Sequence, residues 1–428
     1  MPKINLMSVL PLAMLSLPEI GLVLIDLDPS RYQFILEDRP YTSLPLILHS
    51  LFILAFLAAL CLMSLARWGT PKIPLSPVKA EPWMMSRRTV YLVSLLLAVL
   101  VLNQVDVIAL LQGHLEKGEI RTAGAGQAVI IKYFAPSFFA YVCLLYRYVP
   151  GKVSRKAVFT AGAVTFFAGL TLGAKAGAVF TIMPGVLALF LSGIRVRTVV
   201  FLGLGGCIAI VGAGMTFDKF NRGDFVGTLH YVADRAFILE AEPPYKIVRR
   251  AANESLGIDY FPTLAAVATN TVLRLMVPND TMYRYSFSGA VSAEMYPGKI
   301  DEINRGEWNH TPDVMVEGIV AFGFYNFWLM AIIAAVVGRV LIRMVRTSVQ
   351  EGRIAFASVL LTYFVFMYLA WINSAGIASL VHPLALMTLF FVWLLLRAIP
   401  VSTRILGSKS PLTEPIIIPS AETDPRSV

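Results

Sequence analysis

The sequence predicts an all-α, polytopic helical membrane protein with about ten transmembrane helices and one large extracytoplasmic loop that contains short helices. The first observation is composition: the 428 residues are 57% hydrophobic and only 15% charged, which excludes a soluble enzyme. The second is that apolar runs of about 20 residues recur along the chain, the length that spans ~30 Å of hydrocarbon. The third is that basic residues gather in alternate connections between these runs, as the positive-inside rule describes.

The apolar runs divide the chain into ten predicted spans. They cover roughly residues 5–25, 44–66, 89–111, 128–147, 156–173, 176–194, 198–215, 313–338, 354–373 and 379–397. The first run follows a single lysine and has no small-residue cleavage site, so we interpret it as a retained helix and not as a signal peptide. Residues 1–404 then form a single transmembrane domain. The tail, residues 405–428, contains Pro, Ser and Thr without periodicity and is expected to be a disordered cytoplasmic segment.

The orientation follows from the basic residues that come after the even-numbered spans. They are Arg67, Lys72, Lys79, Arg87 and Arg88, then Arg147, Lys152, Arg155 and Lys156, then Arg195 and Arg197, then Arg339, Arg343, Arg346 and Arg353, and finally Arg397 and Arg404. All of them fall on one face, which the positive-inside rule makes the cytoplasmic face. Both termini are therefore expected in the cytoplasm.

The opposite face holds the connection 216–312, which is far longer than an ordinary loop, and long loops usually carry function. Apolar residues recur there at helical spacing and predict a short helix: Phe225, Leu229, Val232, Ala236 and Leu239. Residues 260–277 are more apolar, and we interpret them as an interfacial helix that lies on the membrane. An eleventh span is the alternative, but it would put the basic connection 339–353 on the wrong side.

The segment His310-Thr311-Pro312-Asp313 leads from this loop into the eighth predicted span. Thr311 is expected to cap the helix and Pro312 to occupy its first position. Asp313 and Glu317 would then share one helix face, with Glu317 about a turn and a half inside the membrane boundary. Ionisable groups inside a membrane are costly and are candidates for function. His310, Asp313 and Glu317 are therefore candidate catalytic residues; the alternative is a capping segment with an acid at the headgroup level.

Cations on the outer face form the second candidate group. Arg121 begins a loop of small residues, Lys175 lies in the short turn between the fifth and sixth spans, and Lys132 lies about one turn into the fourth span. Guanidinium groups bind phosphate oxygens bidentately and lysine acts as a point charge. These residues predict an outer pocket for a phosphate or pyrophosphate, against the alternative of a surface arginine and two lysines that extend to the interface.

Metal and nucleic-acid sites are not expected. The five histidines, His49, His114, His230, His310 and His382, fall at or near the outer face but show no pair at metal-ligand spacing. Cys61, Cys143 and Cys207 all lie within apolar runs and are interpreted as small buried hydrophobes. The net charge of +9 could indicate nucleic acid, but the basic residues are explained by membrane orientation.

The chain combines many apolar spans with one large outer loop near the C-terminal third and an outer Arg among small residues. As the chain leaves that loop it contains His310-Thr311-Pro312, Glu317-Gly318 and Phe322-Gly323. In this combination the chain resembles the bacterial O-antigen and oligosaccharide repeat-unit polymerases of the Wzy type. The resemblance implies a multi-pass protein of the bacterial inner membrane that acts on polyprenyl-diphosphate-linked oligosaccharide at the periplasmic face. The growing glycan would move from its lipid carrier to a sugar hydroxyl of the next unit, without cofactor, nucleotide sugar or metal. The lipid-linked oligosaccharide and the bilayer are then the expected partners, and nucleic acid is not a partner. Whether a chain-length-regulating membrane protein also binds is left open.

This chemistry gives the candidate residues roles. Fixed cations must stabilise the charge on the leaving diphosphate, and the candidates are Arg121, Lys175, Lys132, Arg235 and Arg274. The attacking hydroxyl needs a proton acceptor, for which His310 and Glu317 are both open, one as base and the other as its orienter.

Three other functions remain open from the sequence. An O-antigen ligase would use the same donor but transfer the glycan to a lipid core. A lipid-linked oligosaccharide flippase or other transporter would place charged groups near the midplane, often with paired repeats. A lipid-phosphate-sugar glycosyltransferase could be built around Asp26 and Asp28 at the outer end of the first span.

Overall fold

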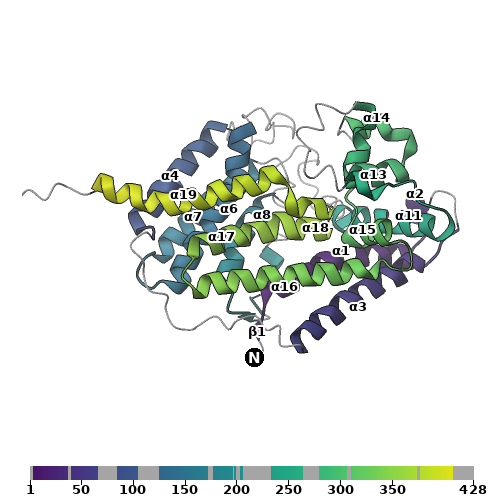
Figure 1. Cartoon of the computed structure of the whole chain (residues 1–428), viewed down its shortest axis with the longest axis horizontal. Helices are drawn as coiled ribbons and strands as arrows, with labels where there is room; N and C mark the ends of the chain where they lie inside the picture. The colour runs from purple at the N-terminus through teal and green to yellow at the C-terminus, as the bar shows by residue number, and fades with distance from the viewer. Residues whose placement is uncertain are drawn as a thin grey trace, which may run out of the picture.

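The computed structural model of the chain has an all-α architecture (Figure 1). The structure describes residues 3–36, 40–65, 84–104, 125–171, 177–195, 197–198, 203–205, 233–263, 279–305, 310–373 and 376–407. The one strand pairing within these residues joins β1 (Lys3–Ile4) to β2 (Ile194–Arg195), and it is antiparallel. Because each strand has only two residues, this pairing fastens the start of the chain without changing the fold class.

Four helices within the described residues are long and apolar enough to cross a membrane. They are α1 (Leu6–Leu27), α3 (Leu44–Leu65), α16 (Trp328–Gln350) and the continuous helical stretch Ile354–Asn373. That last stretch consists of α17 (Ile354–Tyr363), the π-helical turn η5 (Phe364–Leu369) and α18 (Ala370–Asn373). Many large apolar side chains of these helices are exposed, for example Leu54, Leu62 and Val340, as expected of surfaces that face lipid.

The other predicted spans that the structure describes also contain helices. These are α4 (Arg87–Gln104), α6 (Ala125–Tyr148), α7 (Arg155–Leu170), α8 (Gly177–Leu189) and α19 (Pro383–Gly407), which follows the short turn η6 (Ile377–Val381). Prolines lie inside several helices, including Pro18 of α1, Pro136 of α6 and Pro184 of α8. Membrane helices tolerate proline because neighbouring groups satisfy the freed backbone. Most of the predicted span 198–215 lies outside the described residues, and the count of ten spans stays a prediction.

The predicted eighth span, 313–338, is wrong as a single helix. The structure has α15 (Val314–Phe322) and then α16, which begins at Trp328 and continues to Gln350. Gly323 ends α15 with a φ of 80°, a conformation that other residues rarely adopt. The expected cap is also wrong: Asp313, not Thr311, is the N-cap, and its carboxylate accepts a hydrogen bond from the Val316 N–H at 2.9 Å.

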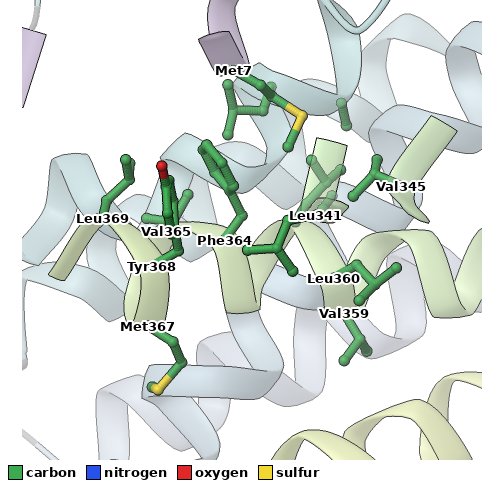
Figure 2. Close-up of a cluster of buried hydrophobic side chains, with 14 of the residues drawn as sticks. Met7, Leu341, Val345, Val359, Leu360, Phe364, Val365, Met367, Tyr368 and Leu369 are labelled. Carbon is green, nitrogen blue, oxygen red and sulfur yellow. The ribbon is translucent and has the colours of Figure 1, made fainter. Parts of the chain in front are cut away.

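Close helix packing forms the core. α16 packs along α3 and α17, and α6 packs between α7, α8 and α17. Figure 2 shows the side chains at the junction of α16, α17 and η5, where Met7 of α1 also inserts. Tyr368 lies against Gly338 of α16, and its hydroxyl donates to the Ala334 carbonyl at 3.0 Å. A larger residue at 338 would displace this ring, so glycine allows the two helices to approach each other.

A group of short helices lies at one end of the molecule, beside α15 and the start of α16 (Figure 1). It contains α2 (Gln33–Leu36), η2 (Asp234–Ile238), α11 (Leu239–Asn253), η3 (Asn279–Tyr285), α13 (Phe287–Met295), η4 (Pro297–Lys299) and α14 (Ile300–Asn304). α11 packs against α1, α3 and α15 and therefore connects this group to the apolar helices.

The structure describes only part of the long loop 216–312, so only some of the expectations for it can be compared with the structure. Ala236 and Leu239 are helical, in η2 and α11, whereas Phe225, Leu229 and Val232 lie outside the described residues. Of the expected interfacial segment 260–277, the described residues 260–263 form a helical turn. α19 continues to Gly407, three residues into the segment 405–428 that was expected to be a tail.

Candidate functional site

His310 lies in a compact cluster of polar side chains between α11, α13 and the start of α15. Its Nδ1 is 3.6 Å from a carboxylate oxygen of Glu242, and its ring stacks on that of Tyr296 with centroids 5.2 Å apart. The Tyr296 hydroxyl donates to the Glu242 carboxylate and accepts a hydrogen bond from Lys246 Nζ at 2.6 Å. Lys246 also lies 3.2 Å from Glu242, one helical turn away on α11. The four residues thus form one connected network.

The charges in this network favour a neutral imidazole. Glu242 and Lys246 are both buried and balance each other. Burial lowers the pKa of His310, and although the Glu242 carboxylate raises it, the Lys246 ammonium lowers it further. His310 therefore carries no charge near neutral pH and can accept a proton, with an exposed side-chain fraction of 11%.

The backbone around His310 is fixed by neighbouring polar contacts. The His310 N–H donates to the Ser292 hydroxyl at 2.8 Å, and the Thr311 hydroxyl donates to the Glu240 carboxylate at 3.1 Å. Arg250 of α11 binds the Glu294 side chain and the backbone at the end of α13. These contacts hold α11 and α13 together on either side of the imidazole.

Glu317 lies in a second, separate set of contacts. Its carboxylate accepts hydrogen bonds from the Tyr260 hydroxyl at 2.7 Å, the Trp371 indole N–H at 2.6 Å and the Ile377 N–H at 2.7 Å. The side chain is only 1% exposed. Burial and the adjacent carboxylate raise the pKa of Tyr260, so the phenol stays protonated and remains a donor. Glu317 therefore connects α15, α18 and η6 with three neutral donors.

Asp313 belongs to a third set of contacts, buried between α1, α3 and α15. His49, which is 0% exposed, places Nε2 2.9 Å from Asp313 and Nδ1 2.6 Å from Glu19. The second oxygen of the Glu19 carboxylate accepts a hydrogen bond from Ser50 at 2.5 Å. The histidine thus lies between two carboxylates that come from different helices.

Counting donors and acceptors fixes the proton content of this triad of Glu19, His49 and Asp313. A neutral imidazole has one donor and one acceptor, and ionised carboxylates only accept. Because both ring nitrogens face carboxylate oxygens, the two hydrogen bonds need one proton more than a neutral histidine and two carboxylates hold. The triad then has one cation between two anions, or one carboxylic acid, and it joins three helices by charge-assisted hydrogen bonds.

The three predicted catalytic residues thus have different partners. Within the described residues, the Glu317 side chain contacts Tyr260 and Trp371. The Asp313 side chain contacts His49, and neither carboxylate contacts His310. Of the predicted cations, Arg121, Lys175 and Arg274 lie outside the described residues, as does the side chain of Arg235 in η2. Lys132 is exposed on α6, with Nζ 5.4 Å from the centre of the Tyr133 ring.

Sequence reasoning missed Glu19, His49, Glu242 and Lys246. Glu19 and His49 lie inside predicted apolar spans, where any ionisable residue is a signal for function or pairing. Glu242 and Lys246 have the four-residue spacing of an ion pair on one helix face. Tyr296 had no comparable signal, because its role depends on how α13 packs against α11.

Comparisons with protein-family models, with curated protein sequences and with solved structures found no match to this chain.

Gly376 gives a direct test of the Glu317 contacts. A Cβ at this position would lie 2.9 Å from the Phe287 Cβ and 3.1 Å from a Glu317 oxygen. We expect Gly376→Ala to destabilise the protein by about 1–3 kcal/mol, the usual cost of overpacking. Gly298→Ala is the matched control, because a Cβ there would meet nothing within 4 Å. Thermal unfolding in detergent measures both, and equal midpoints would show that the Glu317 environment is not tightly packed.

Proposed function

We propose that this protein is a membrane glycosyltransferase that polymerises polyprenyl-diphosphate-linked oligosaccharide repeat units at the periplasmic face of the bacterial inner membrane. The observation that carries the proposal is the His310 imidazole beside the Glu242 carboxylate. The helices α11, α13 and α15 that surround it lie at one end of the molecule (Figure 1). The proposal includes the ten-span topology, with 216–312 in the periplasm and both termini in the cytoplasm. The sequence resemblance to Wzy-type polymerases supplies the substrate class.

In the proposed reaction, a sugar hydroxyl of the incoming unit attacks the anomeric carbon of the growing glycan. The bond from that carbon to the diphosphate oxygen breaks, and its electron pair leaves with the polyprenyl diphosphate. His310 takes the hydroxyl proton, and Glu242 orients the ring through Nδ1, the usual arrangement of a base and its orienter. The predicted cations, Arg121, Lys175 and Lys132 among them, would stabilise the leaving diphosphate.

The geometry favours His310 over Glu317 as the base. Both Glu317 oxygens already accept hydrogen bonds from protein donors, which restricts the access of a substrate hydroxyl to them. His310 is neutral and lies next to a carboxylate. Glu242 therefore replaces Glu317 as the proposed orienter, and Glu317 takes a positioning role that joins α15 to α18 and η6.

The same residues would serve an O-antigen ligase, so the acceptor must be determined by experiment. Purified protein is incubated with a defined lipid-diphosphate oligosaccharide, and the glycans are separated on a gel. A ladder of products supports the polymerase, and transfer only to a lipid core supports the ligase. If the protein carries out neither reaction, the proposal is contradicted and a flippase or other transporter is favoured.

The proposed topology predicts which positions are reachable from outside the cell. In a variant without Cys61, Cys143 and Cys207, we expect Glu254→Cys at the end of α11 to react with a membrane-impermeant thiol reagent in cells with a permeable outer membrane. Lys156→Cys in α7 is the control on the opposite face, and both positions are exposed. Labelling of Lys156→Cys but not Glu254→Cys would invert the topology and place His310 in the cytoplasm.

A further inference from the structure

A cavity of about 440 Å³ lies where α16 turns into α17, bordered by α6 and α19. The lining residues that matter here are Tyr141, Glu351, Arg353, Phe356, Trp393 and Arg397. Its volume falls within the range of ligand pockets, roughly 300–1,000 Å³. None of these residues belongs to the His310 network or to the triad.

The polar side of this cavity carries two arginines. Arg397 lies with its guanidinium carbon 5.8 Å from the centre of the Trp393 ring. Arg353 is 66% exposed and contacts Glu351 through Nε at 3.1 Å. That exposed ion pair is weak, and a guanidinium has further N–H donors for another acceptor. With two cations against one carboxylate, the lining has a net positive charge.

The cavity lies at the opposite end of α16 from α15. α16 has 23 residues, so at ~1.5 Å per residue its length is about 34 Å, close to the ~30 Å of a hydrocarbon core. The cavity and the end of α16 that follows α15 are therefore separated by about one membrane thickness. The further arginines Arg339 and Arg343 lie along the same half of α16, as expected on a cytoplasmic side.

The apolar side of the cavity continues onto a lipid-facing surface. Trp393 contacts Phe356 and Phe390, with ring centroids 6.5 and 5.6 Å apart. Along α19, Leu386 and Phe390 are exposed at four-residue spacing and form an apolar stripe that ends beside Trp393 and Arg397, on the same face of the helix. Tryptophan prefers the headgroup level, where one side is apolar and the other is wet.

We propose that this cavity binds the phosphate headgroup of an anionic phospholipid from the leaflet that surrounds the turn between α16 and α17. The two arginines bind the phosphate oxygens, Trp393 and Phe356 contact the glycerol region, and the acyl chains lie along the exposed stripe of α19. Basic pockets between membrane helices on the cytoplasmic side recognise lipid headgroups in this way. The site is independent of the proposed glycosyl transfer, because it lies at the other membrane surface.

The test uses the full chain in nanodiscs of phosphatidylcholine and phosphatidylglycerol in equal amounts. Native mass spectrometry then measures the lipid that stays bound to the released protein, and a titration with phosphatidylglycerol gives the apparent affinity. We expect the affinity to fall about fivefold for each arginine removed in Arg353→Gln and Arg397→Gln. Both side chains are exposed, so the variants should fold. Arg343→Gln removes an exposed arginine of α16 outside the cavity and is the matched control.

The site is supported if the wild type and Arg343→Gln retain phosphatidylglycerol in preference to phosphatidylcholine. The double variant Arg353→Gln/Arg397→Gln should lose this preference. The proposal would be overturned if the wild type and the double variant retained equal amounts of phosphatidylglycerol. It would also be overturned if Arg343→Gln lost as much phosphatidylglycerol as the double variant. Inorganic phosphate is added in a separate arm. If phosphate alone displaces the lipid, the cavity is a free-anion site and the phospholipid proposal fails.

Discussion

His310→Ala should lower the rate of glycan polymerisation by a factor of ~10²–10⁴, the usual contribution of a general base. The reason is that the attacking hydroxyl keeps its proton when no acceptor lies beside it. Binding of the lipid-linked donor should be nearly unchanged, since the diphosphate is proposed to contact the cations and not the imidazole. The rate is measured from ladder formation with purified protein, and donor binding from co-purified labelled lipid. His382→Ala, at the junction of η6 and α19, is the matched control and should keep normal activity.

The pH dependence of the wild type and of two neighbouring variants tests the same assignment. A base acts in its neutral form, so activity is present above its pKa and is lost as pH falls through it. Because burial lowers the pKa of His310, that loss should occur below the usual ~6.5 of histidine. Lys246→Met removes a cation that lowers this pKa, so the loss should move to higher pH. Glu242→Gln removes the carboxylate that raises it, so the loss should move to lower pH.

Near-normal turnover in His310→Ala would remove His310 from the chemistry. Profiles that shift in the same direction in Lys246→Met and Glu242→Gln would mean that the titrating group is not this imidazole. Either result leaves the fold intact as described, because His310 is not part of the contacts that join α1, α3 and α15.

Hydropathy correctly predicted the long apolar helices Leu6–Leu27, Leu44–Leu65 and Ile354–Asn373, because each one depends on a local run of side chains. The break at Gly323 was not predicted, since a single glycine inside an apolar run is compatible with a continuous helix. The cap was misplaced by two residues for a related reason. Thr311 and Asp313 are both good caps in isolation, but in the structure the Thr311 hydroxyl donates to Glu240, and Asp313 caps α15.

The partners of the candidate residues could not be predicted from local pattern. His49 and Asp313 are separated by 264 positions in the sequence, and His310 meets Glu242 from a helix that the sequence did not indicate. The sequence singled out ionisable residues at the start of α15, but it treated His310, Asp313 and Glu317 as one group. Helix spacing relates neighbours on one helix, whereas these three side chains contact three different sets of helices.

His49 gives the prediction with the largest expected effect on stability. His49→Ala leaves the Glu19 and Asp313 carboxylates facing each other without the imidazole between them. Removing one partner of a buried ionic contact typically costs about 3–5 kcal/mol, because the remaining charge is uncompensated. We therefore expect a large fall in the midpoint of thermal unfolding in detergent. His382→Ala is again the control, since it removes an imidazole outside the triad.

A second substitution separates the loss of charge pairing from the loss of packing. Asparagine is as good an N-cap as aspartate, so Asp313→Asn keeps the start of α15 but removes one of the two charges. In the His49→Ala background, Asp313→Asn should therefore restore part of the lost stability, although in the wild type it should reduce stability. Residues in contact couple by about 0.5–3 kcal/mol in such double-mutant cycles. If His49→Ala does not fold, Asp313→Asn alone still decides: an unchanged midpoint would mean that the contact between His49 and Asp313 contributes nothing. Strictly additive effects of the two substitutions would mean that the imidazole fills space between α1, α3 and α15 without balancing their charges.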